Sequence, residues 1–148
     1  MCETTVQAPV VTPRERGDWR TNPHELGRRG ETVALRSIQS RGWTVLGRNW
    51  RSGYGEVDII ALDPDAPVGT VSLIEVKTRL DRGGSDEVLP ELAVDEERRK
   101  RYKDAARCFL QVNDWASVVR FDVIAITVTD DGIAHMRHIK DAYGVDLA

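Results

Sequence analysis

The sequence predicts an α/β fold, in which helices pack on a central mixed β-sheet. Two segments show helical periodicity and five show the alternating or β-branched pattern of strands. They follow the order helix, three strands, helix, two strands, which is typical of a sheet covered by helices. The 148 residues, 41% of them hydrophobic and 30% charged, suit one soluble domain with a single core. We expect this domain over 22–148 and a disordered tail over 1–21, where no periodicity is present.

The first helix is expected from Asn22 to about Arg41. Asn22 is a typical N-cap residue, Pro23 suits the first helical position, and Gly42 ends the helix. Glu31 lies in the middle of the apolar face, where a carboxylate is unusual. Either it bonds to a backbone group or an arginine at the edge of that face, or it points toward a functional cluster. The apolar face consists of Gly27, Ala34, Leu35 and Ile38.

The remaining elements follow from alternation, turn residues and one further apolar stripe. Strands are expected over 43–48, 56–62, 70–78, 118–129 and 134–139. The glycines of 49–55 favour a hairpin turn, and the two prolines of 63–69 favour a loop. A second helix is expected over 95–112. Its apolar stripe consists of Tyr102, Ala105, Ala106, Phe109 and Leu110.

Two of the expected strands carry charged residues among strongly apolar neighbours. Asp58 lies on the second strand, and Glu75 and Lys77 share one face of the third. If these strands are adjacent, the three side chains converge, because alternate residues lie only about 6.6 Å apart along a strand. Glu31 is expected to point toward the same cluster. The competing interpretation is a solvated strand face with an ion pair worth under ~1 kcal/mol.

A divalent cation such as Mg²⁺ would suit this set of residues. Mg²⁺ is held by one or two carboxylates, together with water and substrate phosphate. Asp58 and Glu75 can supply the carboxylates, and the Val76 carbonyl is a third candidate oxygen. Lys77 can then orient an attacking water or stabilise a pentacovalent phosphate.

Five ordered blocks of the sequence carry a family resemblance. They are Gly30-Glu31, Asn49-Trp50-Arg51, GEVDII over 55–60, EVKTR over 75–79, and Arg120-Phe121-Asp122. In this order and spacing they resemble the YraN-type uncharacterised bacterial family. That family is similar to the restriction-endonuclease-like superfamily, PD-(D/E)XK, and within it to the archaeal Holliday-junction resolvases. The resemblance covers about residues 24 to 143.

The resemblance implies a fold, a site and a cofactor. The fold is a restriction-endonuclease-like central mixed β-sheet with a helix on each side. The superfamily's helix acid matches Glu31, its metal-binding aspartate matches Asp58, and its Glu-x-Lys matches Glu75 and Lys77. These four residues would be catalytic, with Mg²⁺ or Mn²⁺ as the cofactor. One departure is Arg98, which stands where the family usually has a lysine.

The implied activity is a metal-dependent endonuclease that hydrolyses DNA phosphodiester bonds, including those of branched DNA. One alternative is a non-catalytic nucleic-acid-binding or assembly protein of the same fold. A third interpretation is an interaction domain whose charged strand faces are solvated. Because junction-cutting enzymes cut two strands symmetrically, a homodimer is expected by analogy alone.

Basic residues are the candidates for contact with DNA. The net charge of −3 argues against indiscriminate coating of nucleic acid, so any affinity must be local. The alternative is a solvated helix face balanced by Glu96 and Glu97. Arg120 and Asp122 share a strand face, and a structural ion pair that involves one of them is expected rather than a catalytic role. The candidate phosphate contacts are Arg51, Arg79, Arg98, Arg99, Arg101 and Lys103.

The sequence favours a cytoplasmic location. It has no apolar run near the ~20 residues of a membrane span, and its first residues lack the pattern of a signal peptide. Cys2 and Cys108 lie far apart, so we expect no disulfide and a reducing compartment.

Overall fold

A computed structural model of the protein describes residues 19, 22–53, 55–81 and 96–143, with the side chain of Arg98 excepted. The predicted tail over 1–21 lies outside this part of the chain, apart from Trp19. Two helices and five strands confirm the predicted α/β class and element order. They are α1 Pro23–Ser40, β1 Thr44–Ser52, β2 Gly55–Leu62, β3 Thr70–Leu80, α2 Glu96–Val112, β4 Val118–Val128 and β5 Ala134–Ile139.

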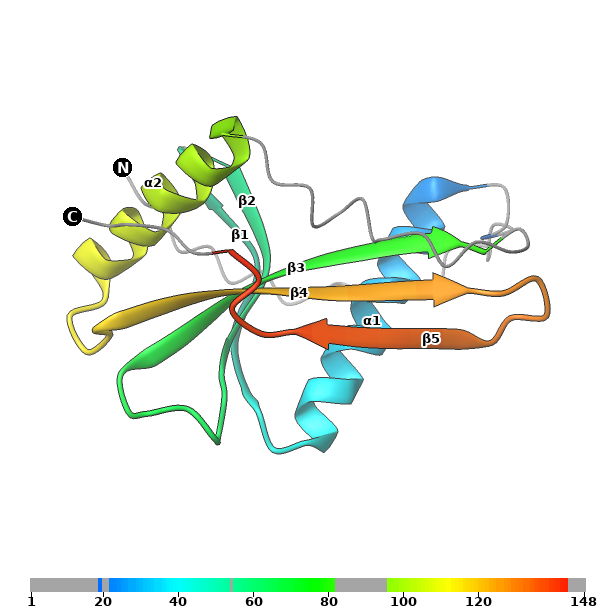
Figure 1. Cartoon of the computed structure of the whole chain (residues 1–148), viewed down its shortest axis with the longest axis horizontal. Helices are drawn as coiled ribbons and strands as arrows, with labels where there is room; N and C mark the ends of the chain where they lie inside the picture. Colours follow the sequence, from blue (N-terminus) through cyan, green and yellow to red (C-terminus); the bar gives the residue numbers. More distant parts are fainter. Residues whose placement is uncertain (1–18, 20–21, 54, 82–95, 144–148) are drawn as a thin grey trace.

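The five strands form one mixed sheet in the order β1-β2-β3-β4-β5. β3 and β4 are parallel over their whole lengths, and the other three neighbouring pairs are antiparallel. The parallel pair requires a crossover between β3 and β4, and α2 lies in this connection. Figure 1 shows α1 behind β3, β4 and β5, with α2 near the β1–β2 hairpin.

Each face of the sheet carries its own apolar core under one helix. On the α1 face, Ala34 and Ile38 pack with the buried residues Ile59 and Ile74. On the α2 face, Ala105, Ala106 and Phe109 belong to a second cluster. That cluster also contains Trp50, Val57, Ile60, Leu73, Phe121 and Tyr143. The predicted mixed sheet with a helix on each side is therefore confirmed.

The start and end of α1 follow the sequence signals. The Asn22 side chain accepts hydrogen bonds from the N–H groups of His24, at 3.0 Å, and Glu25, at 3.3 Å. Arg41 is the C-cap, and Gly42 has a φ of +85°, the left-handed conformation that glycine adopts readily.

The predicted turn over 49–55 is too long. β1 continues to Ser52, and its register with β2 runs through Trp50–Val57 to Ser52–Gly55. The reason is the packing of Trp50, which is only 2% exposed and meets Phe109 edge-on in the α2 core. Burial of this indole keeps the strand paired almost to the tip of the hairpin.

A close contact at Gly30 sets the position of α1 on the sheet. A Cβ at Gly30 would lie 1.7 Å from the Oγ1 of Thr78 on β3, so only glycine fits at this distance. This approach brings the next residue, Glu31, close to the sheet.

Two predictions about compartment meet the structure here. Within the described part of the chain, no helix is both long enough and apolar enough to cross a membrane. Cys108 is buried and disulfide-bonded, so the prediction of no disulfide is wrong for this residue. The prediction depended on separation in sequence, and tertiary packing can bring distant residues together.

Candidate functional site

The candidate site lies where β2 separates from β3. The register pairs of these strands run from Ile59–Ile74 to Ala61–Ser72. Beyond them the β1–β2 hairpin turns away from β3, as Figure 1 shows. Asp58 is the first residue past the paired segment, and its Oδ2 accepts a 2.7 Å hydrogen bond from the Val76 N–H. A carboxylate thus bonds to the β3 backbone at the point where the strands diverge.

Asp58 is a carboxyl group whose charged form is disfavoured. Burial, together with the nearby charges of Glu75 and Glu56, raises its pKa from 3.8 to about 6. The Val76 hydrogen bond and the charge of Lys77 oppose this shift. A positive ion beside Asp58 would therefore reduce the repulsion between its carboxylate and those of Glu75 and Glu56.

Glu31, on α1, lies within electrostatic reach of the same cluster. Burial raises its pKa, and the charges of Asp58 and Glu56 act in the same direction. Arg48 on β1 partly offsets them. Of the two interpretations left open by the sequence, the structure supports a position within electrostatic reach of Asp58, with an arginine also nearby.

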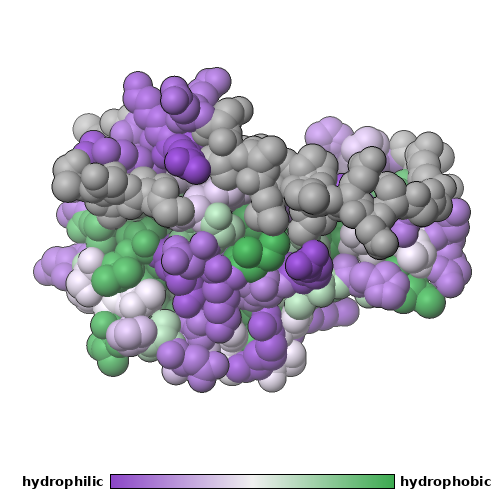
Figure 2. Space-filling view, viewed as in Figure 1, coloured by the Kyte–Doolittle hydropathy of each residue, from purple (hydrophilic) through white to green (hydrophobic). Residues whose placement is uncertain are grey.

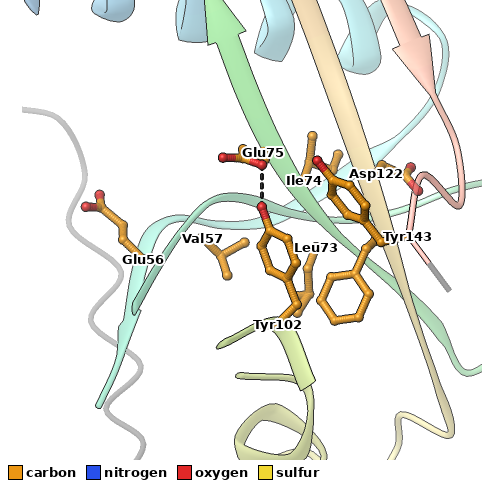
Figure 3. A pocket seen from close by; sticks show the side chains of 9 residues that line it. Glu56, Val57, Leu73, Ile74, Glu75, Tyr102, Asp122 and Tyr143 are labelled. Carbon is orange, nitrogen blue, oxygen red and sulfur yellow. Dashed lines mark hydrogen bonds between the residues drawn. The ribbon is translucent and has the colours of Figure 1, made fainter. Parts of the chain in front are cut away.

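Glu75 is bonded at both carboxylate oxygens. Its Oε1 lies 3.2 Å from the Nζ of Lys77 on the same face of β3. Its Oε2 accepts a hydrogen bond from the hydroxyl of Tyr102 on α2, drawn as a dashed line in Figure 3. The β3 carboxylate is thereby connected to the helix that carries most of the basic residues.

A cavity of about 200 Å³ opens between α2, β2 and β3 beside this cluster. Negative and positive side chains both face it, so it can accept a polar ligand with anionic groups. The lining residues are Gly55, Glu56, Val57, Glu75, Lys77, Arg101, Tyr102 and Ala105.

The structure brings some of the predicted phosphate contacts near the cavity. Arg101 lines it, and Arg51, whose side chain is 81% exposed, lies 4.0 Å from Glu56 at its rim. Arg99 is exposed on α2, Lys103 is half-buried there, and Arg79 is half-buried on β3. Hydrophilic side chains gather over α2 in Figure 2. The side chain of Arg98 lies outside the described residues.

A second polar cluster is formed by residues of β4 and β5 and of the segments that follow β2 and β5. We call Asp63, Arg120, Asp122, His138 and Lys140 the paired network. Arg120 binds Asp122 at 2.8 Å, which confirms the predicted ion pair, and it also lies 3.0 Å from Asp63. His138 Nε2 lies 2.9 Å from Asp122, and Lys140 lies 2.9 Å from Asp63.

In the paired network the carboxyl pKa values are lowered, whereas the pKa of Asp58 is raised. Burial alone would raise the pKa of Asp122, but hydrogen bonds from His138, Arg120 and the Asp141 N–H lower it. Burial would also raise the pKa of Asp63. Its hydrogen bonds with Lys140, the Asp65 N–H and Arg120 outweigh this effect and lower the pKa to about 2. Both carboxylates are therefore stable as anions.

Several residues of these clusters were not assigned to them by the sequence. Tyr102 belongs to the predicted apolar stripe of α2, where its ring does pack, but that stripe does not predict the bond from its hydroxyl to Glu75. The sequence does show a tyrosine among basic residues at the start of the apolar stripe, and this pattern could have indicated a functional hydroxyl. Asp63 and His138 gave no such signal, because their partners lie far away in sequence.

The donors around Asp58 suit a hard divalent cation. In the described part of the chain, no three His, Cys, Asp or Glu side chains form a group that would hold a metal alone. Asp58 and Glu75 supply two carboxylates. In a strand, the N–H and C=O of one residue point to the same neighbour, so the Val76 carbonyl faces the side of Asp58. Two carboxylates and a carbonyl suit Mg²⁺ or Mn²⁺, which keep water ligands.

Comparisons with known proteins identify the family. The sequence pattern of "Uncharacterised protein family UPF0102" matches residues 30–126. A UPF0102 protein of Geotalea daltonii is 36% identical over 134 residues, covering 90% of this chain and 98% of the relative. A UPF0102 protein of Mycolicibacterium smegmatis is 43% identical over 120 residues, covering 78% and 92%. The predicted YraN-type family is thereby confirmed, and the chain belongs to the UPF0102 family.

Proposed function

We propose that this protein is a metal-dependent nuclease that hydrolyses phosphodiester bonds of DNA, with a fold related to the PD-(D/E)XK superfamily and its archaeal resolvases. One observation carries the proposal. A half-buried aspartate with a raised pKa bonds to the backbone between Glu75 and Lys77, at the point where two strands separate. A perturbed acid beside a second carboxylate and a lysine, next to a cavity, is typical of a functional site.

Each residue has a role in this proposal. Asp58, Glu75 and the Val76 carbonyl hold Mg²⁺ or Mn²⁺, which when bound polarises the phosphate and lowers the pKa of a water. Lys77, whose side chain is 38% exposed beside the cavity, stabilises negative charge on the attacked phosphate. Glu31 orders water at the same cluster. The water oxygen forms a bond to phosphorus as the P–O bond of the leaving strand breaks.

The basic residues supply the affinity for DNA in this proposal. Arg101 faces the cavity, and Arg51 and Arg99 extend the positive surface around it. Each phosphate neutralised on duplex DNA contributes a salt slope of about −0.9. We therefore expect weak, salt-sensitive binding without sequence preference. Branched DNA, a homodimer and a cytoplasmic location belong to the same proposal.

A second candidate is a nucleic-acid-binding protein of the same fold that does not cut. The observation in its favour is that Lys77 and Tyr102 already engage both oxygens of Glu75. In that case the acid cluster would bind no cation, and only the basic surface would have a function.

The test is a cleavage assay on four-way junction, flapped and linear duplex DNA with Mn²⁺. We expect the wild type to cut, and Asp58→Ala and Lys77→Ala to lose cleavage. Lys77→Ala should still bind DNA, because Lys77 acts on charge that develops in the transition state. The matched control is Asp114→Ala, which removes an exposed carboxylate outside the cavity and should cut normally.

The same assay separates the alternatives. Cutting that persists in both Asp58→Ala and Lys77→Ala would mean a contaminating nuclease and contradict the proposal. Salt-sensitive binding without cutting on any of the three DNA forms would favour the non-catalytic candidate. Charge reversal at Arg99 and Arg101 should abolish binding in either case, and retained binding would remove α2 from the DNA surface.

A further inference from the structure

The ring of Tyr102 is held firmly beside the candidate site. It stacks on Tyr143 at a centroid distance of 5.1 Å and an interplanar angle of 19°. It also lies 5.1 Å from the ring of Phe121 on β4. Tyr143 and Phe121 are both buried, so the three rings form a rigid packing unit. The position of the Tyr102 hydroxyl is therefore set by the core.

This hydroxyl restrains a flexible side chain. Glu75 has three rotatable side-chain bonds, and its carboxylate reaches past the packed region into the cavity. The Tyr102 O–H donates to Oε2 while Lys77 lies on Oε1, so both ends of the carboxylate are fixed. Each carboxylate oxygen can accept two bonds, so one oxygen can serve Tyr102 and a cation together. In Figure 3 the phenol of Tyr102 points directly at Glu75 from α2.

We propose that Tyr102 is a positioning residue for cation binding: its hydroxyl holds the Glu75 carboxylate in the orientation that serves an ion beside Asp58. This inference rests on the proposed function, because it needs the cation site. It adds a residue that lies outside the Asp58 and Glu75-Val76-Lys77 set and comes from α2. Hydrogen-bonded partners of ligating carboxylates typically change metal affinity by 10–100-fold when removed.

The experiment compares two variants that each remove one hydroxyl from the ring stack. Tyr102→Phe keeps the stacking and removes the bond to Glu75, whereas Tyr143→Phe leaves that bond in place. Calorimetric titration with MnCl₂ alone, without DNA, gives the affinity of each protein. We expect Tyr102→Phe to bind Mn²⁺ about 10-fold or more weakly than the wild type. Tyr143→Phe should bind like the wild type.

A spectroscopic readout keeps the test independent of folding. When Mg²⁺ binds Glu75, the phenol bonded to it should change its near-ultraviolet absorbance. The difference spectrum should be present in the wild type and in Tyr143→Phe, and absent in Tyr102→Phe. Thermal unfolding of the metal-free proteins should show that Tyr102→Phe remains folded at the titration temperature.

The outcomes separate this proposal from the proposed function. A wild type that binds no Mn²⁺ would overturn the cation site itself and this proposal with it. A wild type that binds Mn²⁺, with equal affinity in Tyr102→Phe, would overturn the role of Tyr102 alone. Equal weakening by Tyr102→Phe and Tyr143→Phe would also overturn it, since loss of either hydroxyl, and not loss of the bond to Glu75 in particular, would then be responsible.

Discussion

Two regions of the sheet hold carboxylates that are buried or half-buried, and the surroundings shift their pKa values in opposite directions. In the paired network, Asp122 is 1% exposed and accepts bonds from Arg120, His138 and the Asp141 N–H. Around Asp58, the hydrogen bond comes from one backbone N–H, and the neighbouring charges include Glu75 and two further glutamates. Burial raises the pKa in both places, but only the paired network overcomes it.

The difference indicates what each region is for. In a buried, fully paired acid cluster, removal of any one partner strongly destabilises the fold. Buried acids that repel one another reduce stability, and such an arrangement is typical of sites that bind or transform something. Cationic groups next to the paired network also pack on the ring of Trp43. The ring centroid lies 5.3 to 5.8 Å from the charged groups of Arg120 and Lys140, which belong to the network, and of Arg41, which does not. No such packing is present among the described residues around Asp58.

The largest effect is expected in the paired network. Asp122→Ala should lower the free energy of unfolding by about 3–5 kcal/mol, because Arg120 loses its buried partner. Urea unfolding at pH 7 measures this. Asp114→Ala, at an exposed position, is the control and should change stability by less than about 0.5 kcal/mol. A cost below about 1 kcal/mol for Asp122→Ala would mean that the paired network contributes little to the fold.

An effect of opposite sign is expected at Asp58. Its pKa in the folded protein, about 6, lies above the 3.8 of the unfolded chain, so the folded state binds the extra proton between these values. Stability from this group is therefore present below pH 4 and is lost as the pH rises to about 6. The full shift corresponds to roughly 2–3 kcal/mol.

Asp58→Asn tests this sign. The amide oxygen can still accept the Val76 hydrogen bond, but it carries no charge. Urea unfolding between pH 4 and pH 7 should show the variant gaining on the wild type as the pH rises, and exceeding it at pH 7. Equal stability of the two proteins at every pH would show that the acid cluster is not strained.

The smallest effect concerns the approach of α1 that brings Glu31 to the cluster. Gly30→Ala places a methyl group against Thr78 and should cost about 1–2 kcal/mol, since overpacking outweighs the better helix propensity of alanine. Gly27→Ala is the matched control, because no atom lies within 4 Å of its new Cβ. It should stabilise the helix by up to about 1 kcal/mol. Thermal unfolding compares the two, and a neutral Gly30→Ala would mean that α1 can shift without cost.

The sequence by itself determined the order of the elements, the ends of α1 and the face shared by Glu75 and Lys77. These features follow from periods of 3.6 and 2 residues and from capping residues, which depend on near neighbours along the chain. The end of β1 was missed because it depends on the burial of Trp50 under α2, which is a distant contact.

Only the tertiary structure decided which charged groups are paired. Asp122 and His138 are 16 residues apart, and Tyr102 and Glu75 are 27 apart, so no local pattern relates them. The pKa of Asp58 likewise depends on where β2 leaves β3 and on which charges gather there. The sequence shows which side chains carry charge, but packing decides how far each charged group is removed from water and which groups it contacts. Burial and contacts therefore distinguish the paired network from the candidate site.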